Sequence, residues 1–272
     1  MKSYTKYLII VLALLFCDTL NAQLPTQGKW GTYKGVVDAP SGETVIELTG
    51  DVEMHGVIRI LAGSTLKIVS KKDVTIKNVN VMNPSENYNN PGRSRFFTNR
   101  GVLIIEGQDG ATITLDGGAA YSWSDYTLTP GANSRKLSEM IANEGTLRFK
   151  NVTIQDVNTD DPEISDNGGA FLISNAATLG TTVLENCTIQ RCYAPLGSAI
   201  MIGAQTNSVS YTPEDHKVEL INSLIQHCVS GRSTGSNSGG TIRTYGNTVS
   251  NLYLTNTTFS ENYAMRNTKI TN

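Results

Sequence analysis

Short apolar runs that alternate with polar residues recur along most of the chain, and they have the period of strands rather than of an amphipathic helix. Near the N-terminal end the runs are separated by glycines, which is typical of turns. The strands predicted there are Val45 to Leu48, Val57 to Ile60, Leu66 to Val69 and Val74 to Ile76. Leu137 to Ala142 is a stretch that allows a short helical turn. The pattern therefore predicts an all-β chain.

The second half of the chain repeats one unit four times, in which an Asn separates two short strand-like runs. The four residues are Asn151, Asn186, Asn222 and Asn256, spaced by 35, 36 and 34 residues. A fixed period of this length indicates a repeat architecture. The four Asn side chains are predicted to form a structural ladder, because equivalent residues of stacked coils lie about 4.8 Å apart and stacked amides can hydrogen-bond.

A second short element, rich in small residues, lies between the Asn units at 168–173, 197–202 and 239–243. Each period thus holds about three short strands separated by turns. A propeller blade would need four antiparallel strands and usually hairpin turn signals, which do not fit this pattern. The repeat favours a solenoid in which each Asn marks a corner.

The Gly-Gly-Ala-Phe element at 168–171 and the Phe-Ser-Glu-Asn element at 259–262 are similar to the two tetrapeptides of polymorphic outer-membrane protein repeats. More broadly, the chain resembles the pectin-lyase-like proteins over about residues 101–264, and loosely over 44–82. The resemblance implies a right-handed, single-stranded parallel β-helix of about six or seven coils. It also implies an inward-facing Asn ladder.

Residues 1–22 have the pattern of a secretory signal peptide, with a basic start, an apolar run from Leu8 to Phe16 and Ala22 at the cleavage site. The apolar run is too short to span a bilayer. Cys17 suggests a lipoprotein anchor as an alternative, but the bulky residue before it fits ordinary cleavage better. We therefore expect an exported protein, secreted or at the cell surface, with no transmembrane anchor.

The mature domain is expected to span residues 23–272 as one parallel β-helix. After the fourth Asn unit no small-residue element completes the coil, although solenoids usually have a capped end. A chain truncated at its C-terminus would show this pattern.

The amino-acid composition supports the predicted all-β fold, and the net charge limits the classes of partner that we expect. Only 17% of residues are charged, and Gly, Asn and Thr number 25, 24 and 31; these residues favour strands and turns. The net charge of −2 gives no support for nucleic-acid binding, which needs a basic surface. The partners that remain are a polysaccharide or a host or cell-surface protein.

Cys192 and Cys228 occupy the same place in successive repeats. Stacked coils would bring their Cα atoms within the range of a disulfide, and an exported protein meets oxidising conditions. The alternative is that both are small buried residues with free thiols. The sequence leaves both interpretations open.

Two loops offer candidate binding residues. The acidic loop places Asp160, Asp161, Glu163 and Asp166 close together, which suits Ca²⁺ or simply a solvated turn. Apart from this calcium ion we expect no cofactor. The insertion at 117–145 contains Tyr121, Trp123 and Tyr126, whose rings could stack on sugars or cover apolar surface.

The sequence assembles no complete acid–base or nucleophile arrangement, so we assign no catalytic residue. We expect a non-catalytic, adhesin-like protein that presents the loops at 83–101 and 117–145 to a glycan or a protein. The alternative is a polysaccharide lyase or glycosidase that acts on an acidic polysaccharide, with the acidic loop in a groove.

Overall fold

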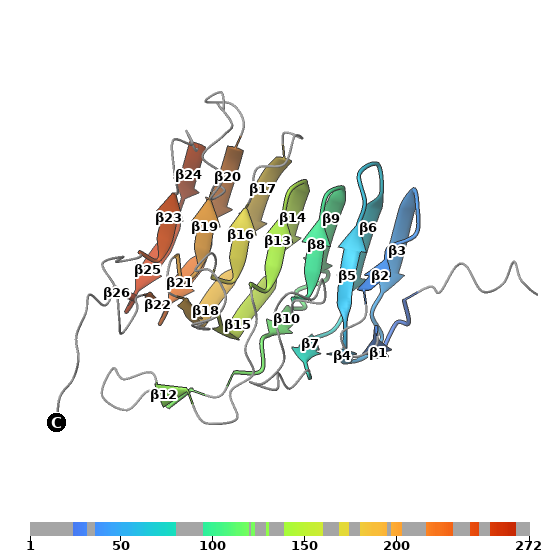
Figure 1. The fold of residues 1–272 in the computed structure, drawn as a ribbon, viewed down its shortest axis with the longest axis horizontal. Coiled ribbons are helices and arrows are strands. Elements are labelled where there is room, and N and C mark those ends of the chain that lie inside the picture. The colour runs from blue at the N-terminus through green and yellow to red at the C-terminus, as the bar shows by residue number, and fades with distance from the viewer. Residues whose placement is uncertain are drawn as a thin grey trace, which may run out of the picture.

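The computed structural model consists mainly of three parallel β-sheets (Figure 1). Successive strands along the chain are added to the three sheets in turn. The structure describes residues 24–31, 36–79, 95–119, 121–122, 129–130, 139–159, 169–173, 180–194, 197–202, 216–230, 240–244 and 251–264. Every regular element within these ranges is a strand. The prediction of an all-β fold with stacked parallel strands is confirmed, and the arrangement is that of a solenoid.

Within the three parallel sheets, a strand pairs with the strands one turn of the chain before and after it, except at the two ends of the stack. Sheet A contains β1 (Gly28–Trp30), β4 (Val52–Met54), β7 (Val74–Asn78), β10 (Ile113–Asp116), β15 (Val152–Asn158), β18 (Thr188–Ala194), β21 (Leu224–Gln226), β22 (Val229–Ser230), β25 (Thr258–Ser260) and β26 (Tyr263–Ala264). Sheet B contains β2 (Val36–Asp38), β5 (Val57–Ile60), β8 (Phe97–Asn99), β13 (Ile141–Asn143), β16 (Phe171–Ile173), β19 (Ile200–Ile202) and β23 (Ile242–Thr244). Sheet C contains β3 (Glu43–Glu47), β6 (Thr65–Ser70), β9 (Val102–Gly107), β14 (Thr146–Lys150), β17 (Gly180–Glu185), β20 (His216–Ile221) and β24 (Asn251–Thr255). A separate antiparallel pair consists of β11 (Tyr121–Ser122) and β12 (Thr129–Pro130).

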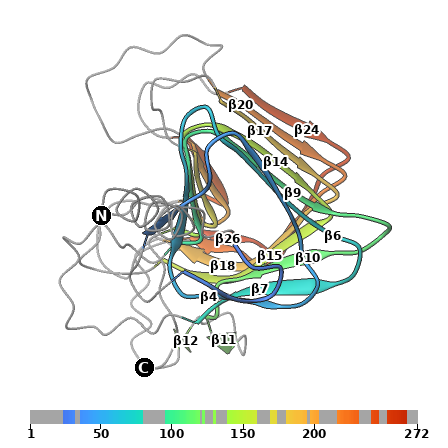
Figure 2. The ribbon, with the colours of Figure 1, turned by 90° about the vertical axis from the view of Figure 1, so that its right-hand side faces the viewer.

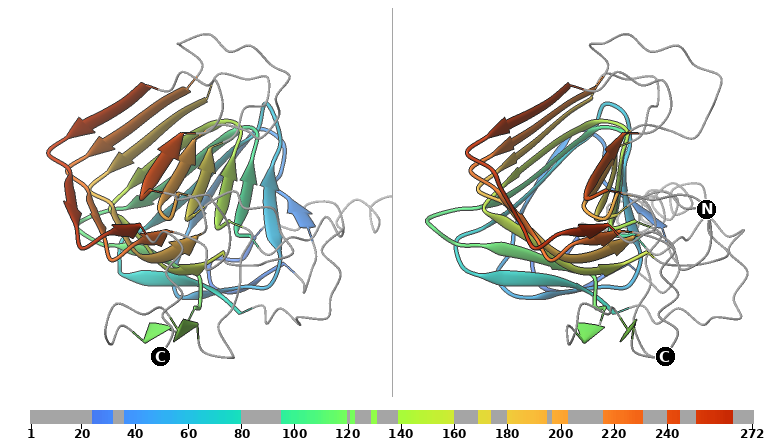
Figure 3. Two further views of the ribbon diagram at one scale, coloured as in Figure 1. Left: turned by 60° about the vertical axis from the view of Figure 1, so that its left-hand side comes forward. Right: turned by 90° about the vertical axis from the view of Figure 1, so that its left-hand side faces the viewer.

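Seen along the stack, the sheets form three sides around one apolar interior (Figures 2 and 3). Alternate residues of each strand point inward, and like residues meet from coil to coil. Leu103 and Ile105 of β9 pair with Leu147 and Phe149 of β14, and all four are buried. Burying such a side chain stabilises the fold by about 1.5–3 kcal/mol, so the interior row is the main source of stability.

The N-terminal strands lie where the apolar pattern predicts them, as at Val57–Ile60. Two short strands differ from the predictions. Phe97–Asn99 lies inside the predicted loop at 83–101, and Ile141–Asn143 is a strand where the pattern allowed a helical turn. The reason is packing across coils, because Ile141 pairs with Phe97 on one side and Phe171 on the other.

The Asn residues of the repeat lie at the corners between sheet C and sheet A. Their φ angles are positive: 54° at Asn151, 52° at Asn186, 48° at Asn222 and 47° at Asn256. Asn tolerates this left-handed conformation better than most residues, which explains why one residue type recurs at the corner.

The predicted signal peptide, residues 1–22 with Cys17, lies outside the described residues. In the part of the chain that the structure describes, no helix is long and apolar enough to cross a membrane.

Candidate functional site

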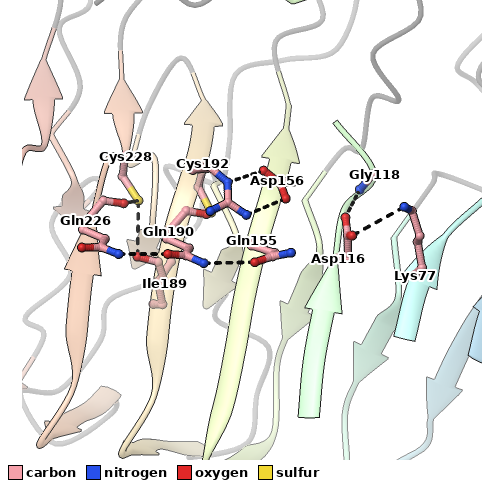
Figure 4. Close-up of polar contacts among 11 residues, drawn as sticks. Lys77, Asp116, Gly118, Gln155, Asp156, Ile189, Gln190, Cys192, Gln226 and Cys228 are labelled. Carbon is pink, nitrogen blue, oxygen red and sulfur yellow. Dashed lines mark hydrogen bonds and ion pairs between the residues drawn. The ribbon is translucent and has the colours of Figure 1, made fainter. Parts of the chain in front are cut away.

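The outer face of sheet A carries a row of three glutamines, one from each of β15, β18 and β21 (Figure 4). Gln190 Nε2 donates a hydrogen bond to Gln155 Oε1 at 3.0 Å, and Gln226 Nε2 donates to Gln190 Oε1 at 2.9 Å. The strand register sets these side chains one coil apart, about 4.8 Å. The result is an amide ladder that runs along the axis of the stack.

Each ladder amide retains hydrogen-bonding capacity after these contacts. A Gln side chain has two N–H donors and a carbonyl oxygen with two lone pairs. In Gln190 the ladder uses one N–H group and one lone pair. A donor and an acceptor side by side complement a hydroxyl group, which both donates and accepts.

A second row lies beside the ladder and has unusual backbone geometry. Asp156, Arg191, His227 and Glu261 each stand five residues after an Asn corner, and their φ angles lie between 50° and 55°. This conformation costs about 1–2 kcal/mol for a residue with a Cβ. Backbone strain of this kind clusters at functional positions, which makes the row a candidate for binding. We call the glutamine row and this charged row together the ladder face.

An ion pair and a hydrogen bond join neighbouring members of this row. Arg191 Nε and Nη2 donate to the two carboxylate oxygens of Asp156 at 2.6 and 2.8 Å. The hydrogen bond to Asp156 raises the pKa of the Arg191 guanidinium, although burial acts in the opposite direction. His227 Nε2 lies next to a carboxylate oxygen of Glu261. The paired charges fix the side chains of this row in place.

Toward the N-terminal end the ladder row continues with charged residues. Asp116 pairs in register with Gln155, and Lys77 pairs with Asp116. The Lys77 Nζ atom lies 3.8 Å from Asp116 Oδ2, and Asp116 Oδ1 accepts a hydrogen bond from the backbone N–H of Gly118 at 2.7 Å (Figure 4). The ladder face therefore changes from charged to amide side chains along the axis.

The four predicted ladder asparagines form hydrogen-bonded pairs along their corner. Asn186 Nδ2 donates to Asn151 Oδ1 at 3.2 Å, and Asn256 Nδ2 donates to Asn222 Oδ1 at 3.0 Å. Asn186, Asn222 and Asn256 are exposed, so this ladder does not face inward as the family resemblance implied. The corner conformation turns these side chains toward solvent.

A buried amide ladder stands at a different corner, between sheets B and C. Asn99 and Asn143 are 0% and 2% exposed, and Asn99 Nδ2 donates to Asn143 Oδ1 at 2.7 Å. Sequence reasoning missed this pair because the two residues are 44 positions apart and lie outside the four aligned units.

Of the two interpretations left open for Cys192 and Cys228, the structure has the second, because both residues are buried free thiols. Strand β18, which contains Cys192, stacks in the expected register on β21 and β22, the two strands that flank Cys228. Each Sγ atom donates to the carbonyl oxygen two residues earlier in the chain, 3.4 Å away, at Gln190 for Cys192 and at Gln226 for Cys228. The alternative of small residues stacked in the core is the one the structure contains.

The third buried thiol, that of Cys187, is expected to lower the free energy of unfolding as the pH rises into the alkaline range. Burial raises the pKa of Cys187 to about 12, whereas an unfolded Cys titrates near 8.5. Above about pH 8.5 the unfolded chain loses a proton that the folded chain keeps, so folding loses about 1.4 kcal/mol per pH unit from this thiol. We expect Cys187→Val to remove this dependence, because Val152 fills the equivalent place in the preceding coil.

Urea unfolding at about pH 8 and pH 10 measures the difference. The wild type should lose about 2 kcal/mol more than the variant over this interval. If the free energy of unfolding falls equally in both proteins between these two pH values, the Cys187 thiol already ionises in the folded state.

The predicted loop residues lie mostly outside the described part of the chain. This holds for the calcium candidates Asp160, Asp161, Glu163 and Asp166, and for the aromatic residues Trp123 and Tyr126. The backbone of Tyr121 belongs to β11, but its side chain is not described. Among the described residues, no three His, Cys, Asp or Glu side chains gather as a metal site.

The chain matches no family model, and comparisons with the curated proteins and with the solved structures also give no match. A fold alone does not define a function. The ladder face is the candidate binding site, and its signal in the sequence is a Gln at the same position of three aligned units, Gln155, Gln190 and Gln226.

Proposed function

We propose that the protein is an exported, non-catalytic, adhesin-like β-helix that binds a glycan or protein partner through its outer faces and loops. The fold proposed is a right-handed, pectin-lyase-like coil of about six or seven turns. Three parallel sheets stacked in order support it, as does the repeat of 34 to 36 residues. The signal-like residues 1–22 support export to the surface or the medium.

The observation that carries the binding proposal is the amide ladder. Its three amides stand one coil apart on one sheet, and each has a donor and an acceptor left for a ligand. A polymer with regularly spaced hydroxyl groups can bond successive rungs, so we propose an extended polysaccharide that lies along the stack. Paired charges beside the ladder can orient it.

The loops extend this proposal. Tyr121, Trp123 and Tyr126 follow β10, the strand that supplies Asp116 to the same face. Aromatic rings in this position would add flat apolar contacts to sugar rings. The acidic residues 160–166 follow β15 and would hold Ca²⁺ if the ligand carries carboxylates.

A polysaccharide lyase or glycosidase is the second candidate. The observation in its favour is that Asp116 and Asp156 lie on the ladder face with basic residues beside them. Paired carboxylates are what glycoside hydrolysis uses. Incubation with acidic polysaccharides, with and without calcium, separates the two candidates. Release of shortened or unsaturated oligosaccharides would show that the protein is an enzyme and would contradict the adhesin proposal.

Gln190→Leu is expected to weaken polysaccharide binding about tenfold or more, because two hydrogen bonds of about 0.5–1.5 kcal/mol each are lost. The replacement keeps a strand-compatible side chain of similar size. Retention on a panel of immobilised polysaccharides, followed by titration calorimetry with the one retained best, measures the effect.

Arg148→Leu is the matched control. Arg148 is an exposed, outward side chain at the centre of β14 on sheet C, so its loss should leave binding unchanged. If Gln190→Leu and the control bind as tightly as the wild type, the amide ladder is not the binding surface. If the panel retains no protein, the glycan proposal itself is wrong.

A further inference from the structure

A row of hydroxyl groups runs beside the amide ladder on the outer face of sheet A. It contains one threonine from each of β7, β10, β15 and β18, namely Thr75, Thr114, Thr153 and Thr188. Each stands two residues before a member of the ladder row, so its side chain points to the same side of the sheet. All four are partly exposed. Their hydroxyl groups make no hydrogen bond in the part of the chain that the structure describes, so they remain for a ligand.

The charged side chains next to the amides have partners within the protein. These partners are Arg191 with Asp156, His227 with Glu261, and Lys77 with Asp116. Arg191 and Asp156 are only 30% and 18% exposed, and two hydrogen bonds join them. A charged ligand would have to separate such a pair, which leaves a half-buried charge without its partner and costs free energy. A ligand without charge meets no such cost.

The same face has few of the side chains on which protein interfaces depend. Those interfaces concentrate their binding energy in Trp, Tyr and Arg anchors. The only aromatic residue in β7, β10, β15, β18 and β21 is Tyr193, which is 7% exposed. Arg191 is already held by Asp156. Rows of amide and hydroxyl groups match a hydroxylated polymer better, because each of its hydroxyl groups both donates and accepts.

Given the proposed function, on which this step rests, we propose that the ligand of the ladder face is a neutral, linear polysaccharide that lies across the amide and hydroxyl rows. Like groups recur at every coil, about 4.8 Å apart along the axis. The two rows are separated by about 6.6 Å, the distance between residues two positions apart in a strand. A chain along the axis therefore meets Gln155, Gln190 and Gln226 on one side, and Thr153 and Thr188 on the other.

Neutral and acidic polysaccharides that share one backbone test the charge preference. Three such pairs are hydroxyethyl cellulose with carboxymethyl cellulose, methyl-esterified with de-esterified pectin, and unsubstituted with glucuronate-substituted xylan. Affinity electrophoresis should show binding at least about fivefold tighter to the neutral member of a pair that is retained. Salt screens charges but not neutral hydrogen bonds, so binding should change by less than about twofold between about 50 mM and 500 mM NaCl.

Tighter binding to the acidic members, or binding that salt weakens about tenfold, would overturn the neutral ligand and leave glycan binding in place. No retention on any of the six polymers would contradict the proposed function together with this ligand. The two failures are therefore distinguishable in one experiment.

The double variant Thr153→Val/Thr188→Val tests whether the ligand crosses both rows. Valine keeps the shape of threonine and removes the hydroxyl group, and Leu224 next to Thr188 shows that the row accepts an apolar side chain. The variant should bind the retained neutral polymer about tenfold more weakly. Thr146→Val on the outer face of sheet C is the matched control, because Val102 fills the same place in the preceding coil. Equal binding by the double variant and this control would show that the hydroxyl row does not contact the ligand.

Discussion

Replacing Asn143 with leucine is expected to lower the free energy of unfolding by about 3–5 kcal/mol. The amide accepts from Asn99 Nδ2 at 2.7 Å and from the backbone N–H of Gly145 at 3.3 Å, and it donates to Thr182 Oγ1 at 3.0 Å. Leucine makes none of these bonds. Because the site is buried, water cannot replace them, and each unpaired polar group costs about 1–3 kcal/mol.

Urea unfolding followed by circular dichroism measures this loss, and Asn186→Ala is the control. Asn186 belongs to the exposed corner ladder, where water can replace the lost amide bond. Because Asn186 has a positive φ of 52°, alanine at this position is expected to lower the free energy of unfolding by about 1–2 kcal/mol. If Asn143→Leu destabilises no more than this control, the buried amides are solvated in solution and do not hold the corner.

The coil could be predicted from the sequence because its contacts are local in the repeat. Each strand packs on the strand one period away, so the same pattern reappears at every coil. The four corner asparagines are an example, since one residue type at one spacing identified both the period and the turn. Strands such as Val57–Ile60 follow from alternation alone.

Elements that break the period could not be predicted. Phe97–Asn99 and Ile141–Asn143 are three residues long and lie in or beside long insertions, where no aligned copy marks them. They are strands because Phe97 and Ile141 pair across coils and fill the interior. Packing between distant segments, rather than local propensity, decides such short elements.

The candidate site was partly visible in the sequence. Gln190 and its equivalents could be read from the alignment, but only the side-chain geometry shows that they form a ladder with hydrogen-bonding capacity to spare. His227 aligns with Arg191, which predicted an ordinary strand residue facing solvent. The structure gives both residues a positive φ, and a strained φ cannot be inferred for His or Arg from residue type.

Replacing Gly169 with alanine is expected to destabilise the protein by about 4 kcal/mol or more, enough to unfold a marginally stable domain. Gly169 belongs to the Gly-Gly-Ala-Phe element at 168–171, which leads into β16. A Cβ atom there would collide with the backbone carbonyl oxygens of Gly197 and Ser198 in the next coil. Backbone atoms cannot move aside without breaking the bond from the Ala170 N–H to the Ser198 oxygen, 3.3 Å long, that holds the coils together.

Gly63→Ala separates this steric effect from the general cost of replacing a glycine. Gly63 has a φ of +82°, but nothing lies within 4 Å of a Cβ built there. Its replacement should cost only the left-handed conformation, about 1–2 kcal/mol. Thermal and urea unfolding of the two variants should therefore differ by about 2 kcal/mol or more. Similar losses would mean that the coils separate enough at Gly169 to admit a side chain, and that close backbone approach does not explain the Gly-Gly-Ala-Phe element.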